Sequence, residues 1–118
     1  MVEIRVNGAA VPLKFDLNAM DAIEESTGRF VGEMDFAINS KDKREELMAV
    51  IAALADSAGT VLTREQLRRM TPGELARSLY GVSKAITEGM RMETDAEDPD
   101  AEVDVVLEEI KKNGAPGA

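Results

Sequence analysis

The chain has 118 residues, which suits a single domain that buries about two thirds of the surface its unfolded form exposes. It contains no cysteine and no histidine, which excludes disulfides, thiol nucleophiles and imidazole groups as catalysts or metal ligands. The formal net charge of −9 argues against nucleic acid or an anionic membrane as the main partner. Because no apolar run approaches the roughly 18 residues of a membrane span, and the N-terminus has the pattern of a strand rather than of a signal peptide, we expect a soluble intracellular protein.

Residues 2–15 predict a β-hairpin at the N-terminus. Apolar side chains alternate with polar ones in residues 2–6 and again in residues 11–15, as in strands with one buried face. Asn7 and Gly8 lie between these runs, and both tolerate the positive φ that a type I′ turn requires. Pro12 cannot donate a ladder hydrogen bond, so we expect it at an edge or an outward-facing position.

A capped helix is predicted directly after the hairpin. Asp16 is a typical N-cap residue, because its carboxylate can accept from the free N–H groups of the first turn. Phe15 and Met20 have the spacing of a hydrophobic staple, which fixes the angle at which the chain enters the helix. Gly28 is expected to end the helix in the left-handed conformation.

The middle of the chain predicts two further helical segments. Residues 29–39 are densely apolar, and we expect a short helix within residues 33–38. Asp42 and Glu45 have the spacing of a capping box, which predicts the start of a longer helix. Leucine, valine and isoleucine then recur at helical spacing until Gly59 ends the run.

Two more helix starts follow. Thr63 and Gln66 form a second capping-box pattern and predict a short helix. Thr71 as N-cap, Pro72 at the first helical position and Glu74 at the third predict the start of a long helix.

The long helix has an apolar side that predicts core packing. Its members, spaced by three or four residues, are Leu75, Leu79, Val82, Ile86 and Met90. Gly81 and Gly89 each weaken such a helix by about 1 kcal/mol relative to alanine, unless close packing requires them.

The end of the chain is expected to hold an acidic linker and a separate helix. Residues 93–104 contribute −7 of the net charge and have too little apolar content to pack. An amphipathic helix of about three turns is predicted after them, with Val103, Val106, Leu107 and Ile110 on one side. We therefore predict a mainly α fold: a β-hairpin plus small helical domain (1–92), an acidic linker (93–102) and a C-terminal helix and tail (103–118). Docking of this helix on its own domain and docking on a partner remain equally open.

No catalytic or metal-binding constellation is evident. A calcium loop within the acidic run fails, because a start at Asp95 places Asp100, and a start at Asp98 places Val103, where a glycine belongs. Ser83 and Lys84 are helix neighbours and do not face each other. We therefore expect no enzyme activity, no cofactor and no metal, which leaves a binding protein.

The residues predicted to contact a partner are all apolar. Seven methionines and few aromatic residues give a soft apolar set suited to irregular partners. The first candidates are Phe30, Val31, Met34, Phe36 and Ile38, and the second are Val103, Val106, Leu107 and Ile110.

Three phrases carry a resemblance to a known family: VPLKFDLNAMDAIEESTG, LMAVIAALADSAG and LTREQLRRMTPGELARSLYGVSKAITEGM, within about residues 3–90. They resemble the tail assembly chaperones of long-tailed bacteriophages and prophages. This resemblance implies a helical protein of the host cytoplasm that binds the tape-measure protein, and sometimes tail-tube subunits, and is absent from the mature virion. It also implies a longer product made by ribosomal slippage, and residues 111–113 are compatible with A-rich codons.

Two other classes of function stay open. A structural connector or tail-completion protein would persist in purified virions. An acidic inhibitor that imitates nucleic acid would use residues 93–104 and bind a basic protein in a salt-sensitive way. Self-association into rings or spirals is also compatible with the apolar patch of residues 29–39.

Overall fold

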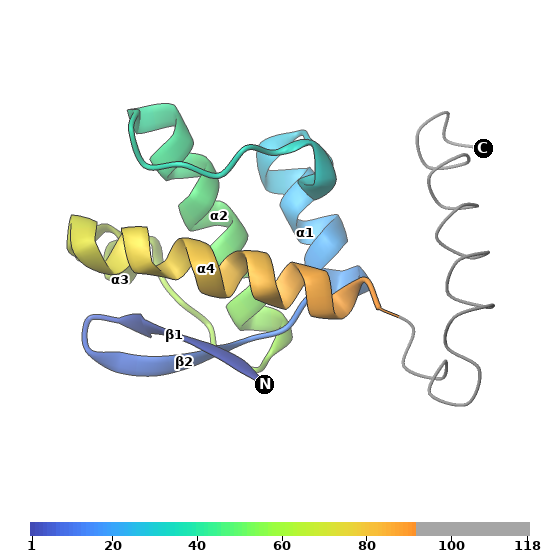
Figure 1. Ribbon diagram of the computed structural model, residues 1–118, viewed down its shortest axis with the longest axis horizontal. Coiled ribbons are helices and arrows are strands. Elements are labelled where there is room, and N and C mark those ends of the chain that lie inside the picture. The colour runs from blue at the N-terminus through green and yellow to red at the C-terminus, as the bar shows by residue number, and fades with distance from the viewer. Residues whose placement is uncertain (92–118) are drawn as a thin grey trace.

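The computed structural model describes residues 1–91, so the expected linker and C-terminal helix lie outside the described residues. The described part is a two-stranded antiparallel sheet followed by helices, which confirms this part of the predicted fold class (Figure 1). Its elements are β1 (Val2–Val6), β2 (Ala9–Leu13), α1 (Leu17–Thr27), the 3-10 turn η1 (Val31–Glu33), α2 (Lys41–Ser57), α3 (Arg64–Arg68) and α4 (Pro72–Gly89).

The hairpin forms as its sequence predicts. Asn7 and Gly8 have φ values of 54° and 86°, which are the two positive values of a type I′ turn. Val6 faces Ala9 across this turn, and the alternate side chains of β1 are buried. Pro12 pairs with Glu3. Counting from the turn, this is a pair that exchanges no hydrogen bonds, so the missing N–H of proline faces away from the ladder.

Helix α1 has both predicted caps. Asp16 accepts a hydrogen bond from the backbone N–H of Ala19 at 2.9 Å, and Gly28 ends the helix with a φ of 75°. The Ser57 hydroxyl also donates to Asp16 at 2.8 Å, which joins the start of α1 to the end of α2. The N–H of Ala19, with a smaller contribution from this hydroxyl, lowers the pKa of Asp16.

The helix predicted within residues 33–38 is wrong. The chain forms only the 3-10 turn η1 and is extended at Met34, with a ψ of 145°. The physical reason is the spacing of Met34, Phe36 and Ile38, whose positions in the sequence differ by two. Side chains at this spacing lie on the same side of an extended chain, but not on the same side of a helix. All three are partly buried against the core.

The predicted start of α2 is also wrong by two residues. Ser40 is the N-cap, and its hydroxyl accepts from the backbone N–H of Lys43 at 3.1 Å. Asp42 instead lies in the first turn, where its charge is favourable to the helix dipole. The end of α2 at Ser57, just before Gly59, agrees with the prediction.

Helix α4 begins as predicted, but Glu74 has a different partner. The Thr71 hydroxyl accepts from the N–H of Glu74, which confirms the N-cap. The carboxylate of Glu74 does not return to its own helix: the N–H groups of Asn7 and Gly8 donate to its two oxygens at 3.0 and 2.9 Å. The N–H groups of Gly8 and Asn7 lower the pKa of Glu74, so the charged carboxylate joins α4 to the hairpin turn.

Close packing explains the two glycines inside α4. Helix α4 crosses α2, with the hairpin along one side of α4 and the α1–α2 connection along the other (Figure 1). A Cβ atom at Gly81 would lie 2.6 Å from Cγ2 of Ile4, and one at Gly89 would overlap the carbonyl oxygen of Phe15. Both glycines therefore let α4 approach the hairpin and the chain that follows it.

Candidate functional site

Two carboxyl groups of the described chain have a lowered pKa, and both are engaged in contacts within the fold. Among residues 1–91 no group of three or more Asp and Glu side chains is placed to hold a metal ion. In the same range every buried side-chain polar atom has a hydrogen-bond partner. The two carboxyl groups with lowered pKa, Asp16 and Glu74, are engaged by backbone N–H groups of a helix cap and of the hairpin turn.

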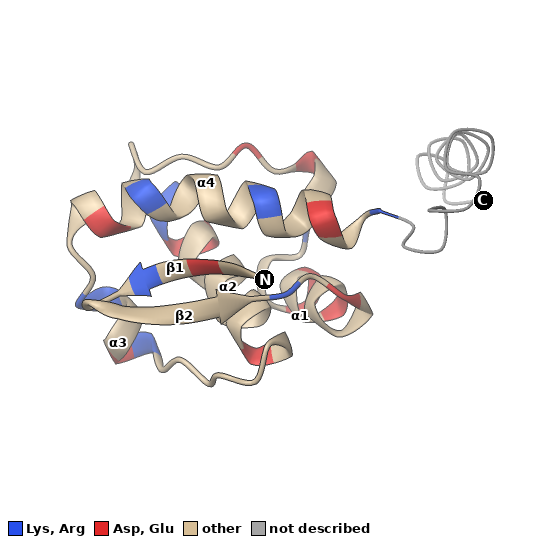
Figure 2. Ribbon diagram, turned by 60° about the horizontal axis from the view of Figure 1, so that its bottom comes forward, with Lys and Arg blue, Asp and Glu red and all other residues tan. Residues whose placement is uncertain are grey.

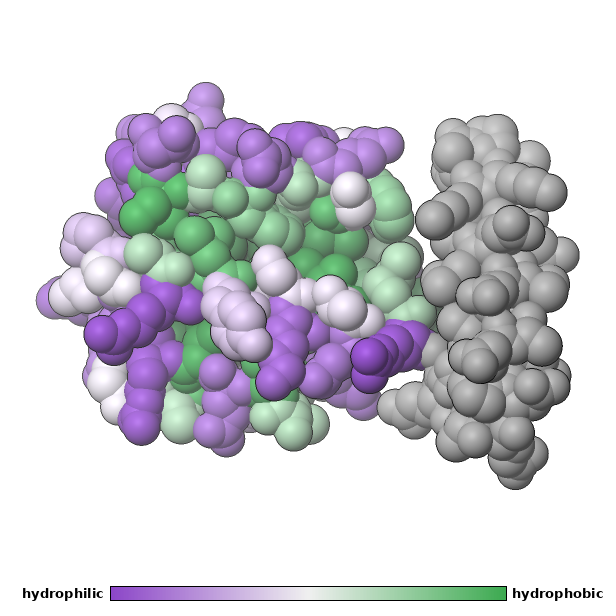
Figure 3. Space-filling model, in the orientation of Figure 1, coloured by the Kyte–Doolittle hydropathy of each residue, from purple (hydrophilic) through white to green (hydrophobic). Residues whose placement is uncertain are grey.

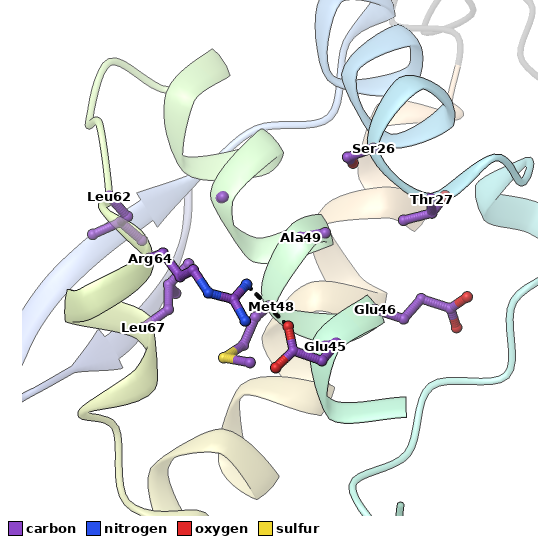
Figure 4. A pocket seen from close by; sticks show the side chains of 10 residues that line it. Ser26, Thr27, Glu45, Glu46, Met48, Ala49, Leu62, Arg64 and Leu67 are labelled. Atoms are coloured by element: carbon purple, nitrogen blue, oxygen red, sulfur yellow. Dashed lines mark ion pairs between the residues drawn. The ribbon is translucent and has the colours of Figure 1, made fainter. Parts of the chain in front are cut away.

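A pocket of about 480 Å³ lies among α1, α2 and α3 (Figure 4). Glu45 pairs in it with Arg64 at 3.0 Å and with Arg68 at 2.7 Å. These partly exposed ion pairs join α3 to α2. Because its charges are already paired, this pocket has no free charge to offer a ligand.

A second hollow, of about 650 Å³, lies between β1 and α4. Its charged lining residues are Glu3, Arg5, Glu74, Arg77 and Lys84. Figure 2 shows both basic and acidic residues along α4 and β1. This side of α4 therefore carries charges of both signs.

An apolar hollow lies where the β2–α1 junction meets the end of α4. We call it the end groove; it has a volume of about 950 Å³. Its apolar lining residues are Met1, Leu13, Phe15, Leu17, Met20, Phe30, Ala85 and Met90. Lys14, Asp16, Glu88 and Arg91 supply its charged residues. Leu17, the first residue of α1, is 75% exposed in this groove, and Met1 is 82% exposed.

A second apolar surface lies between α4 and the segment that connects α1 to α2 (Figure 3). The partly buried apolar residues of these two elements are Met34, Phe36, Ile38, Leu79 and Ile86, and we call this surface the central face. Ile86 lies one helical turn before Met90, so the central face leads along α4 into the end groove. We call the two surfaces together the apolar tract.

The residues predicted for partner contact are divided by the structure. Phe30 lines the end groove and is 36% exposed, while Met34, Phe36 and Ile38 belong to the central face. Val31 is only 4% exposed and packs in the core, so its side chain is not available for contact with a partner. The second candidates, in residues 103–110, lie outside the described residues.

Sequence reasoning did not identify Leu17 or Met1 as surface residues of this site. Leu17 does not share the side of α1 on which Ala19 and Ile23 are buried. This spacing is the feature of the sequence that could have indicated its exposure. The groove itself forms from segments far apart in the sequence, so no local pattern predicts it.

In the part of the chain that the structure describes, no helix has the length and apolar character needed to cross a membrane. Comparison of the chain with family models, with curated proteins and with solved structures gives no match.

Proposed function

We propose that this protein binds an apolar helical polypeptide along the apolar tract, and that it is a tail assembly chaperone whose client is a phage tape-measure protein. The observation that carries the binding proposal is the tract itself, in which Leu17 and Met1 are largely exposed beside a hollow of about 950 Å³. The resemblance of residues 3–90 to the chaperone family supports the choice of client.

The dimensions and composition of the tract suit a helical client. Helix α4 has 18 residues and is therefore about 27 Å long, which is enough to lie beside several turns of another helix. Four of the seven methionines, at positions 1, 20, 34 and 90, lie in the tract. Their flexible, polarisable side chains adapt to irregular apolar partners, as a chaperone of a long client requires.

The chaperone proposal is tested by co-expression with the cognate tape-measure protein. We expect more soluble tape-measure protein in its presence, and we expect the chain to be absent from purified virions by mass spectrometry. Equal solubility with and without the chain would rule out the chaperone function. Detection in virions would favour a structural tail protein.

The binding surface is tested by a matched pair of substitutions. Leu17 and Val61 are both 75% exposed, but Val61 lies in the α2–α3 connection, outside the tract. We expect Leu17→Asp to reduce co-purification with the client about tenfold, as the loss of a central apolar contact does, and Val61→Asp to leave it unchanged. Circular dichroism should show an intact fold for both variants, because neither side chain is buried. Equal binding by the two variants would remove the end groove from the proposed site.

A further inference from the structure

The end groove gathers exposed apolar side chains into one concave site. Single exposed apolar residues are ordinary on a protein surface, but Met1, Leu17 and Phe30 line one hollow of about 950 Å³. A hollow of this size and lining is typical of sites that receive apolar groups. Lys14 and Arg91 lie among its lining residues together with Asp16 and Glu88, so it can also accept charges of either sign at its border.

We propose that residues 103–110 of the same chain occupy the end groove. Apart from Met92, all the large apolar side chains of residues 92–118 fall within this stretch. Val103, Val106, Leu107 and Ile110 have the spacing i, i+3, i+4 and i+7, so a helix would place the four on one side.

Chain length and the position of Arg91 favour this occupant. Arg91 lines the groove and is the last described residue, so the following chain leaves from the groove itself. The eleven residues 92–102 can span up to about 36 Å, and an eight-residue helix is only about 12 Å long.

Tethering also favours the same chain over a second copy. A short flexible linker gives its attached segment an effective concentration in the millimolar range. At a protein concentration of about 10 μM, a second copy would therefore be outcompeted on the order of a hundredfold, even with identical contacts.

Occupation of the end groove would make the segment a competitor of the client. This consequence rests on the proposed function, because the client is proposed to use the same groove. If the segment is docked in about nine molecules of ten, the apparent affinity for the client falls about tenfold. Client binding would then release residues 103–110.

Spin labelling of the full chain tests the docking without any client. The chain has no cysteine, so Asn113→Cys gives a single labelling site close to the proposed helix. We expect the label to broaden the amide NMR signals of Leu17 and Met20 more than that of Val61. Absence of this broadening would overturn the proposal. A mixture of spin-labelled chain with unlabelled, ¹⁵N-enriched chain should show none; broadening in the mixture would mean that a second copy fills the groove.

Two adjacent valines provide the matched control. Val106 belongs to the apolar side of the predicted helix, whereas Val105 lies off it. Val106→Asp should abolish the broadening and Val105→Asp should retain it; equal effects would overturn the docking. With the tape-measure protein, Val106→Asp should bind several times more tightly than Val105→Asp, and equal binding would overturn the competition. If neither variant binds the tape-measure protein, the proposed function is wrong. The broadening of the amide NMR signals would still show whether residues 103–110 occupy the end groove.

Discussion

The three glycines of α4 allow one prediction to be worked out in detail. A glycine inside a helix costs about 1 kcal/mol relative to alanine, so glycine-to-alanine changes in helices ordinarily stabilise a protein. Gly73 should follow this rule, because the nearest atom to a Cβ there is the Thr71 hydroxyl oxygen at 3.9 Å. We expect Gly73→Ala to add about 0.5–1 kcal/mol to the free energy of unfolding.

Gly81 should behave in the opposite way. A Cβ at Gly81 would lie 2.6 Å from Cγ2 of Ile4, a buried side chain on β1. Ile4 pairs with Val11 of β2 and has little freedom to move away, so the added methyl group overpacks the core. Overpacking costs about 1–3 kcal/mol and outweighs the gain of about 1 kcal/mol in helix propensity. The expected net loss for Gly81→Ala is therefore up to about 2 kcal/mol.

Thermal unfolding followed by circular dichroism measures both effects. In a domain of this size 1 kcal/mol shifts the Tm by about 4–8 °C, so the two variants should move the Tm in opposite directions. In an Ile4→Ala background the clashing methyl group is gone, and Gly81→Ala should no longer destabilise. A rise in Tm for Gly81→Ala in the wild-type background, equal to that for Gly73→Ala, would refute the close packing of α4 on β1.

Three other predictions concern stability. Glu74→Gln should lower the free energy of unfolding at neutral pH. The pKa of Glu74 in the folded state lies below its ordinary value of 4.5. The difference in the free energy of unfolding between Glu74→Gln and wild type should therefore be constant above about pH 4.5 and should shrink as the pH falls through the lowered pKa. A difference that does not change with pH in urea titrations would contradict this. Ser40→Ala should cost about 1 kcal/mol as the loss of an N-cap, and Asp42→Ala less, in chemical denaturation; the reverse order would restore Asp42 as the cap. Ile23→Ala should cost about 2–5 kcal/mol, because this fully buried side chain would leave a cavity, and an unchanged Tm would show that α1 packs differently.

Local signals in the sequence were sufficient for the hairpin and for most helix caps. Asn7 and Gly8 specify their turn, and Asp16 and Gly28 specify the ends of α1, through bonds to residues only a few positions away. The start of α2 was missed because Ser40 and Asp42 are both good caps, and the choice between them depends on where the extended segment before α2 ends.

Features that depend on distant segments could not be predicted. The sequence identified Glu74 only as part of a helix start, but its carboxylate accepts hydrogen bonds from a turn 66 and 67 residues away. The burial of Val31 and the exposure of Leu17 likewise depend on how α1, α4 and the intervening segment pack. The patch that includes Phe30, Met34 and Phe36 was recognisable from composition, whereas the end groove requires the fold.

The neighbouring positions of β1 and α4 have a consequence for the order of folding. They are the first and last elements of the described fold, so their contacts close a loop of nearly the whole described length, and such contacts slow folding. Met1 and Arg91 both line the end groove, so a short linker can join them. A circular permutant opened at the exposed Val61 should keep the same packing and fold faster, because α4 and β1 would become consecutive in its sequence.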